Sequence, residues 1–256
     1  MGAAQWIARA HAALAAGVMA AAVACATGPG DVRYASDGPA LTTSDGLQRI
    51  ENWGFDYAFV KPGVDLARYD SVVIGDVSLA YRAPRSPANA TRDGLPRGTY
   101  LLPPHTAKAM KRYLQEALAK QLGKSEGLVV TQPPASNAIR VTSYVIDLVV
   151  YTPPHWGVGN AMTAFLANRG ELTLILDLRD AESGAPLLRV AERSALTFDN
   201  ASAYITANQV SSAAAARQVF RKSATRLRQR LDEVRTLPET PPAPKLARNG
   251  PEAGAE

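Results

Sequence analysis

Apolar residues recur at three- and four-residue spacing in two stretches of the chain, which predicts two amphipathic helices. The first helix is expected over residues 105–122 and the second over residues 210–234. The first stripe consists of Ala107, Met110, Leu114, Ala117, Leu118 and Leu122, and the second of Phe220, Ala224, Leu227, Leu231 and Val234. Gly123 directly follows the first stripe and is suited to end that helix.

Between the helices the apolar positions change to the two-residue period of strands. Strands are predicted over residues 71–79, 128–130, 138–151, 170–179 and 187–196, the last two joined by a turn at 181–186. Leu172, Leu174, Leu176 and Leu178 fall on one face. The 138–151 strand has Ile139, Val141 and Val145 on one face and Tyr144, Ile146, Leu148 and Val150 on the other, which favours a central position.

This order of elements predicts an α+β fold with a single largely antiparallel sheet and helices packed on one face. The domain is expected over residues 50–236. Residues 25–49 are rich in small and polar residues and are interpreted as a lipidated Cys followed by a flexible tether. Residues 237–256 are rich in Pro and Ala and are interpreted as a disordered tail.

The first 24 residues have the pattern of a secretory signal peptide. Residues 12–24 are all apolar or small, and no acidic residue occurs before Asp31. This apolar run is shorter than the roughly 20 residues that span a bilayer, so a cleaved signal is favoured over a membrane helix.

The only Cys in the sequence, Cys25, ends the apolar run in Ala22-Val23-Ala24-Cys25. The pattern resembles a bacterial lipobox, in which the Cys is lipidated and becomes the first residue of the mature protein. Cleavage after Ala26 is the alternative, because Ala24-Cys25-Ala26 also fits the A-x-A rule for simple secretion. Ala26 in place of Asp predicts an outer-membrane lipoprotein that faces the periplasm.

The segment from Tyr57 to Ile74, which contains Pro62-Gly63-Val64-Asp65-Leu66 followed by Tyr69, is similar to the opening of a bacterial lipoprotein family, domain of unknown function 3313. The later residues Gly170-Glu171-Leu172-Thr173, Asp177 and Ser183-Gly184 resemble its strand-turn-strand region. The resemblance implies an exported lipoprotein with an α+β domain, and it brings no reaction and no catalytic residues.

The same opening segment has a physical interpretation of its own. Pro62-Gly63 is a turn dipeptide, and Asp65 is expected to cap a short helical turn through its carboxylate. Leu66 and Tyr69 would then pack against the domain. The segment therefore predicts a structural entry into a strand rather than a binding loop.

Composition excludes several kinds of function. A net charge of +5 over 256 residues does not by itself indicate nucleic-acid binding. With one Cys and three His, a zinc site is not expected. No nucleophile elbow or Walker loop is present, and the run from Gly157 to Met162 lacks the third Gly of a dinucleotide loop. We expect no metal, no cofactor and no catalytic residues.

Two candidate contact surfaces remain. The segment 151–169 gathers Trp156, Met162 and Phe165, which would form either a partner contact or a lid on the core. The last helix carries Arg217, Arg221, Lys222, Arg226, Arg228 and Arg230, with Arg235 just beyond it. These would form a contact for an envelope polyanion or an ordinary solvated face.

The sequence thus predicts a non-catalytic, lipid-anchored protein of the bacterial cell envelope, held to the membrane by its lipid and binding another envelope protein or polymer. The alternatives are a soluble periplasmic protein and an envelope hydrolase with an unrecognised site. A cleft with a convergent acid, base or nucleophile would favour the hydrolase.

Overall fold

The computed structural model describes residues 32–38, 41–132, 134, 136–151, 170–197 and 209–242. One seven-stranded sheet has the order β1-β2-β7-β6-β5-β3-β4. Its strands are β1 (Gln48–Ile50), β2 (Tyr57–Val60), β3 (Ser71–Tyr81), β4 (Val129–Val130), β5 (Ala138–Val150), β6 (Gly170–Asp180) and β7 (Pro186–Ala195). Four neighbouring pairs are antiparallel, while β3 pairs in parallel with both β4 and β5. The α+β class and the mostly antiparallel sheet are therefore confirmed.

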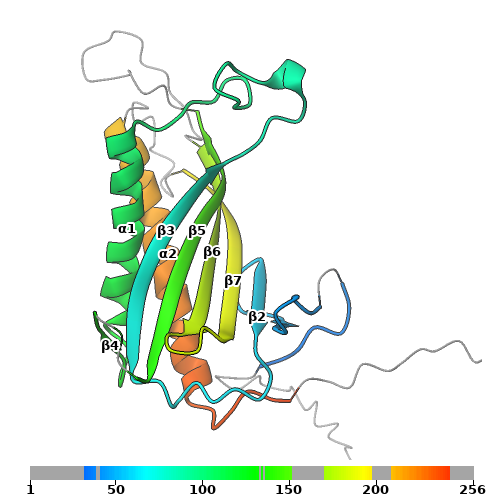
Figure 1. Ribbon diagram of the computed structural model, residues 1–256, viewed down its shortest axis with the longest axis vertical. Coiled ribbons are helices and arrows are strands. Elements are labelled where there is room, and N and C mark those ends of the chain that lie inside the picture. The colour runs from blue at the N-terminus through cyan, green and yellow to red at the C-terminus, as the bar shows by residue number, and fades with distance from the viewer. Residues whose placement is uncertain are drawn as a thin grey trace, which may run out of the picture.

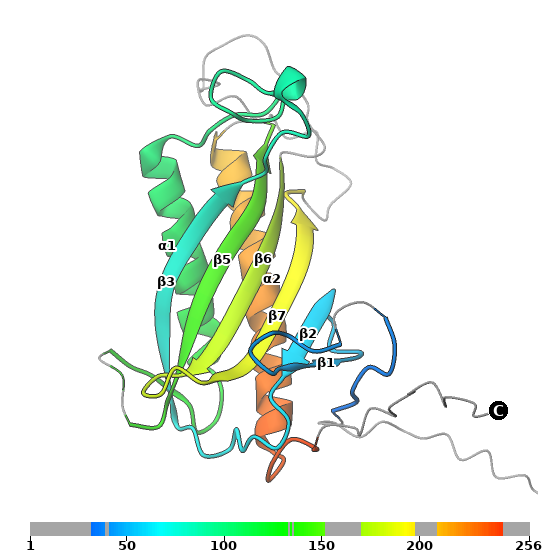
Figure 2. The ribbon, with the colours of Figure 1, turned by 45° about the vertical axis from the view of Figure 1, so that its right-hand side comes forward.

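Two long helices accompany the sheet, α1 (Pro104–Leu122) and α2 (Gln209–Arg235), and a short 3-10 turn, η1 (Pro87–Asn89), lies in the connection after β3. Both predicted helices are confirmed to within one residue at each end. Pro104 suits the start of α1 because its missing N–H would have no partner in the first turn. Figures 1 and 2 show α1 and α2 side by side behind the sheet.

The apolar stripes of both helices and one face of the sheet form a single core. Leu114 and Leu118 of α1, Phe220 and Leu227 of α2, and Leu174 of β6 are all fully buried, or nearly so, in one cluster. The alternation predicted for β6 is confirmed, since Leu172, Leu174, Leu176 and Leu178 are all buried. On β6 the intervening positions, which point to the other face, hold Glu171, Thr173, Ile175, Asp177 and Arg179.

The two-faced pattern predicted for β5 is wrong in its second half. Ile146 and Val149 of β5 pair with Thr173 and Glu171 of β6, so β5 has two residues between these pairs where β6 has one. β5 has the same extra residue relative to β3, its other neighbour, and therefore contains a bulge. A bulge shifts the alternation by one residue. Leu148 and Val150 therefore join the core with Val145 instead of lying opposite to it.

The folded region extends beyond residues 50–236 at both ends. In the segment interpreted as a tether, Val32 and Leu47 are buried and β1 pairs with β2. In the segment interpreted as a tail, Thr240 is fully buried, and its hydroxyl donates a hydrogen bond to the carbonyl oxygen of Lys61 at 2.7 Å. Tyr34 donates a hydrogen bond to the carbonyl oxygen of Pro241 at 2.7 Å, so the first and last described segments are attached to the same corner of the sheet.

An arginine-lined hollow as the candidate functional site

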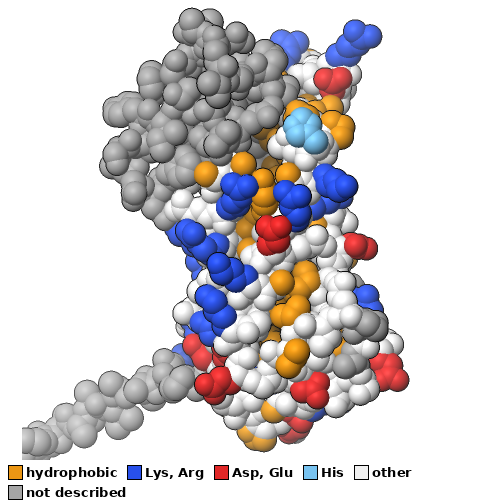
Figure 3. Space-filling model, turned by 90° about the vertical axis from the view of Figure 1, so that its left-hand side faces the viewer, with side chains coloured by type: hydrophobic (Ala, Val, Ile, Leu, Met, Phe, Trp, Pro, Cys, Tyr) orange, Lys and Arg blue, Asp and Glu red, His pale blue; other side chains and the backbone are white. Residues whose placement is uncertain are grey.

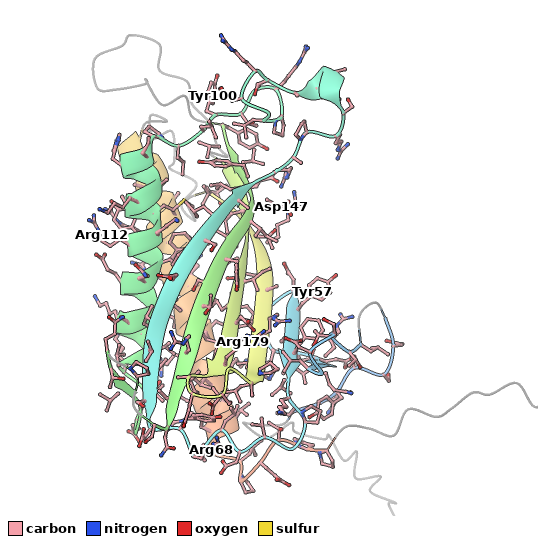
Figure 4. The ribbon with its side chains drawn as sticks, in the orientation of Figure 1. Tyr57, Arg68, Tyr100, Arg112, Asp147 and Arg179 are labelled. Carbon is pink, nitrogen blue, oxygen red and sulfur yellow. The ribbon has the colours of Figure 1, made fainter. Side chains whose placement is uncertain are left out.

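A polar concavity among the described residues lies where β3 ends and the long connection to α1 begins. We call it the arginine hollow. It has a volume of about 480 Å³ and is lined by Arg82, Ala83, Arg85, Asn89, Pro96, Arg97, Asp147 and Arg193. Figure 4 labels Asp147, which marks the sheet side of the hollow. The lining brings together four guanidinium groups, three from the connection between β3 and α1 and one from β7.

The bulge in β5 produces this end of the sheet. Asp147 is the residue at the bulge, and it has a positive φ of 50°, which residues other than Gly adopt infrequently. Tyr81 of β3 pairs with Leu148, so β3 follows the same irregularity. Bulges often redirect a side chain next to a binding site. Here the bulge presents a carboxylate in a ring of arginines.

Two of the four arginines are held by a carboxylate beneath the hollow. Arg82 and Arg193 both donate to Oε2 of Glu171, with N–O distances of 3.0 Å and 2.5 Å. These hydrogen bonds, first from Arg193 and then from Arg82, lower the pKa of Glu171. Tyr151 also donates to Glu171, at 3.4 Å. Glu171 is therefore ionised at neutral pH and fixes the positions of both guanidinium groups.

The other two arginines lie on the connection between β3 and α1, and their side chains are exposed. Within the described ranges, the guanidinium groups of Arg85 and Arg97 have no hydrogen-bond or ion-pair partner. The backbone of Arg97 is constrained, because its N–H donates to the carbonyl oxygen of Asn89 at 3.1 Å and the neighbouring Pro96 bridges to Ala90. Free guanidinium groups on a fixed backbone are suited to bind an anion.

The contact residues predicted from the sequence are not tested by this geometry. Cys25, Trp156, Met162 and Phe165 lie outside the described residues. The strand ends that border the 152–169 segment are described: Val150 pairs with Gly170, and the carbonyl oxygen of Val150 accepts a hydrogen bond from the N–H of Tyr100. The segment thus begins and ends at the same end of the sheet as the arginine hollow.

The basic residues of α2 mostly have structural partners. Arg226 binds Glu192 at 2.5 Å, Arg228 binds Asp232, and Arg230 binds Glu233. Arg235 donates to the carbonyl oxygens of Tyr69, Glu126 and Gly127, and Arg217 lies 3.9 Å above the ring of Tyr113. Figure 3, which views the molecule from the side of α1, shows Lys and Arg side chains scattered among apolar and acidic ones. These contacts favour the interpretation of a largely structural helix surface.

Asp180 links one residue from each part of the family resemblance, Tyr69 and Ser183. Asp65 accepts hydrogen bonds from the N–H groups of Ala67 and Arg68, and Leu66 and Tyr69 are buried, which confirms the predicted capped turn. The hydroxyl of Tyr69 donates to Oδ2 of Asp180 at 2.8 Å. Oδ1 of Asp180 accepts from the N–H and hydroxyl of Ser183, both at 2.8 Å.

This network explains why both parts of the resemblance belong to one structure. The N–H of Ser183, followed by the hydroxyl of Tyr69, holds the pKa of Asp180 well below its usual range. Burial, and then the hydrogen bond to Asp180, raises the pKa of Tyr69 to about 12. Gly170, from the second part, closely approaches β5, because a Cβ there would collide with the carbonyl oxygen of Val149.

A second charged cluster fastens the N-terminal segment to the outer face of the sheet. Arg179, labelled in Figure 4, and Arg189 each bind both Asp177 and Asp45, with N–O distances of 2.6 to 3.1 Å. The hydrogen bond from Arg189, and then that from Thr43, lowers the pKa of Asp45 to about 2. All four charged groups are paired with one another, so this cluster is structural.

In the part of the chain that the structure describes, neither α1 nor α2 is both long enough and apolar enough to cross a membrane. No group of three or more His, Cys, Asp or Glu side chains within the described ranges is placed to hold a metal ion.

The protein is an α+β protein with one open, mostly antiparallel sheet. The model of the family described as "Protein of unknown function (DUF3313)" matches residues 41–227, and the chain belongs to this family. The resemblance found in the sequence is thereby confirmed. No curated protein matches the sequence.

Three solved structures are among those to which this chain is similar. PelC from Paraburkholderia phytofirmans, solved as a dodecamer, is 11% identical, with a TM-score of 0.33 over 66% of this chain and 96% of its own. A hypothetical protein from Chlamydia trachomatis is 10% identical, with a TM-score of 0.34 over 63% of this chain and 97% of its own. A DUF330 protein from Xanthomonas campestris is 12% identical, with a TM-score of 0.30 over 66% and 88%. At these scores the likenesses support no statement about function.

Proposed function

We propose that this protein is a lipid-anchored, non-catalytic component of the bacterial cell envelope that binds an anionic envelope component in the arginine hollow. The observation that carries the binding proposal is the pair of exposed arginines, Arg85 and Arg97, which have no partner among the described residues. The sequence supports the location, through the apolar run at residues 12–24 and the Cys that follows it.

The lining of the hollow supports binding rather than catalysis. It offers one carboxylate, Asp147, and one amide, Asn89, but no Ser, Cys, Lys or His. A hydrolase would require a nucleophile or an activated water next to a base. Arginine remains protonated throughout the physiological range, so four guanidinium groups supply positive charge and directed hydrogen bonds but no general base.

The binding part of the proposal is tested by sedimentation with washed bacterial envelopes. The chain from residue 26 to 256, which contains every described residue, should sediment with them. The double variant Arg85→Gln/Arg97→Gln should lose most of this association. Arg92→Gln is the matched control, because Arg92 is exposed on the same connection and does not line the hollow. Equal sedimentation of the double variant and the wild type would contradict a role for the hollow.

The anchoring part is tested separately by metabolic labelling with palmitate. The full-length protein should be labelled and should fractionate with the outer membrane, whereas Cys25→Ser should carry no label. A mature N-terminus at Thr27 would instead show simple secretion after Ala26, and the lipid anchor would be rejected.

A further inference from the structure

The charge of the arginine hollow constrains its ligand. Four arginines line it, and two carboxylates lie among them, Asp147 in the lining and Glu171 beneath it. Two positive charges are therefore left over. A carboxylate ligand carries one negative charge, whereas a phosphate monoester carries about 1.5 to 2 at neutral pH. The surplus therefore matches a phosphate monoester better than a carboxylate.

The arrangement of the arginines supports the same ligand. Glu171 neutralises part of the charge of Arg82 and Arg193 and holds both on the sheet side of the hollow. Arg85 and Arg97 approach from the two arms of the connection, which the Ala90–Pro96 bridge joins. Guanidinium groups bind phosphate oxygens through paired, parallel hydrogen bonds. Two such groups that form no ion pair with a described carboxylate can satisfy the terminal oxygens of a phosphate monoester.

The volume indicates that the ligand is larger than a phosphate ion. A hollow of about 480 Å³ lies within the range of roughly 300 to 1,000 Å³ that is typical of sites for small organic ligands. The rest of its lining includes the amide of Asn89 and the carboxylate of Asp147, which can bind hydroxyl groups. Ala83 and Pro96 add small apolar surfaces. A polar, hydroxyl-bearing group of about the size of a sugar fits this lining.

We infer, on the basis of the proposed function, that the arginine hollow recognises a phosphate monoester carried by a sugar-sized polar group. Arg85 and Arg97 bind the phosphate, while Asn89 and Asp147 bind the hydroxyl groups of the attached ring. The phosphate is either part of a soluble sugar phosphate or exposed at the surface of a lipid bilayer, and the experiment separates these sources.

The test is isothermal titration of residues 26–256 with glucose 6-phosphate, glucuronate and glucose at pH 7.5. Glucose 6-phosphate should bind at least ~10-fold more tightly than glucuronate, and glucose should not bind measurably. Loss of charge-assisted hydrogen bonds in Arg85→Gln/Arg97→Gln should weaken glucose 6-phosphate binding by at least ~10-fold. The control Arg92→Gln should bind like the wild type, and far-ultraviolet circular dichroism should show that both variants are folded.

Vesicles identify the source of the phosphate. Co-sedimentation with vesicles that contain phosphatidic acid, a phosphate monoester, but not phosphatidylglycerol, a diester, together with displacement by glucose 6-phosphate, would assign the site to lipid-borne phosphate. Binding of glucose 6-phosphate without vesicle binding would assign it to a soluble ligand. Either result supports recognition of a phosphate monoester.

Other results would overturn the inference in distinguishable ways. If glucuronate binds as tightly as glucose 6-phosphate and both require Arg85 and Arg97, the hollow is a general anion site; the proposed function then stands and the phosphate assignment fails. If Arg92→Gln weakens binding as much as the double variant, the attraction is non-specific and the assignment fails. If no anion binds at ~10 mM and the double variant still sediments with envelopes, both proposals fail.

Discussion

Removing the hydroxyl of Tyr69 should destabilise the domain although it creates almost no cavity. Tyr69 is 2% exposed, and its hydroxyl donates a hydrogen bond to Asp180, which is itself buried. Asp180 in turn organises the β6–β7 turn through the N–H groups of Glu182 and Ser183. Tyr69→Phe therefore removes one donor from a charged acceptor that solvent cannot reach readily.

The expected magnitude follows from the charge and burial of the acceptor. A hydrogen bond to a charged group contributes roughly 1.5 to 3 kcal/mol. We expect Tyr69→Phe to lower the free energy of unfolding by about 2 kcal/mol. Arg68 remains bound to Oδ2 of Asp180 at 3.1 Å, but its side chain is 58% exposed, so it compensates little for the lost hydroxyl. For a domain of this size the change corresponds to a fall in Tm of roughly 5 °C.

The assay is urea unfolding of residues 26–256, followed by circular dichroism. Tyr57→Phe is the matched control, because Tyr57 is 42% exposed on the outer face of β2, and it should change stability by less than about 0.5 kcal/mol. A double-mutant cycle with Asp180→Asn should give a coupling energy of at least about 1 kcal/mol. Additive effects, or equal stability of Tyr69→Phe and wild type, would show that this network does not hold the turn to the domain.

Three other predictions concern the core, the acid limit of stability and the undescribed segment. Leu114→Asp places a carboxylate at a fully buried position and should lower the free energy of unfolding by several kcal/mol, measured by urea titration; unchanged unfolding would contradict the core assignment. Arg189 lowers the folded-state pKa of Asp45 to about 2 from an ordinary 3.8. The stabilisation of the folded state by ionised Asp45 is therefore present above about pH 4 and is lost as the pH falls toward 2. Asp45→Asn should remove that part of the pH dependence of the unfolding free energy, which is on the order of 1 kcal/mol. If the unfolding free energy of the variant depends on pH as that of the wild type does, the prediction is refuted. Replacing Trp156 and Phe165 with Ala should abolish envelope sedimentation and leave the domain folded; an unfolded variant would show that these residues are a lid on the core.

The elements that the sequence predicted well are those with a strong local period. Leu172 to Leu178 alternate in sequence and are all buried, and the stripe through Leu114 predicted α1 almost completely. The short strands β1 and β2 were not predicted. β1 has three residues and β2 four, too few for a period to be visible. β2 is held by pairing with the distant β7, and β1 by pairing with β2.

The parallel pairing of β3 with β5 is likewise a consequence of topology, since it follows from the return of the chain through α1. No local pattern in either strand distinguishes a parallel from an antiparallel neighbour when both are interior and apolar. The sequence therefore predicted a central position for β5 without identifying its partners.

The arginine hollow could not be predicted from the sequence, because its charged residues come from the β3–α1 connection, a bulge in β5 and the end of β7. The sequence predicts neither a strand nor a helix between residues 79 and 105, a stretch that contains several Pro and Gly residues. One local signal was present: Asp147 interrupts the apolar pattern between Ile146 and Leu148. In the structure Asp147 lies at the β5 bulge, and bulges are frequent next to functional sites, where they redirect a side chain.

The most direct test of anion binding in the arginine hollow is an NMR titration that observes the side-chain Nε–H groups of the arginines. On addition of glucose 6-phosphate to residues 26–256, the signals of Arg85 and Arg97 should shift together and saturate with one dissociation constant, while the signal of Arg92 stays in place. Shifts confined to Arg217 and Arg221 of α2, with Arg85 and Arg97 unchanged, would place the anion on the helix surface and contradict the proposed site.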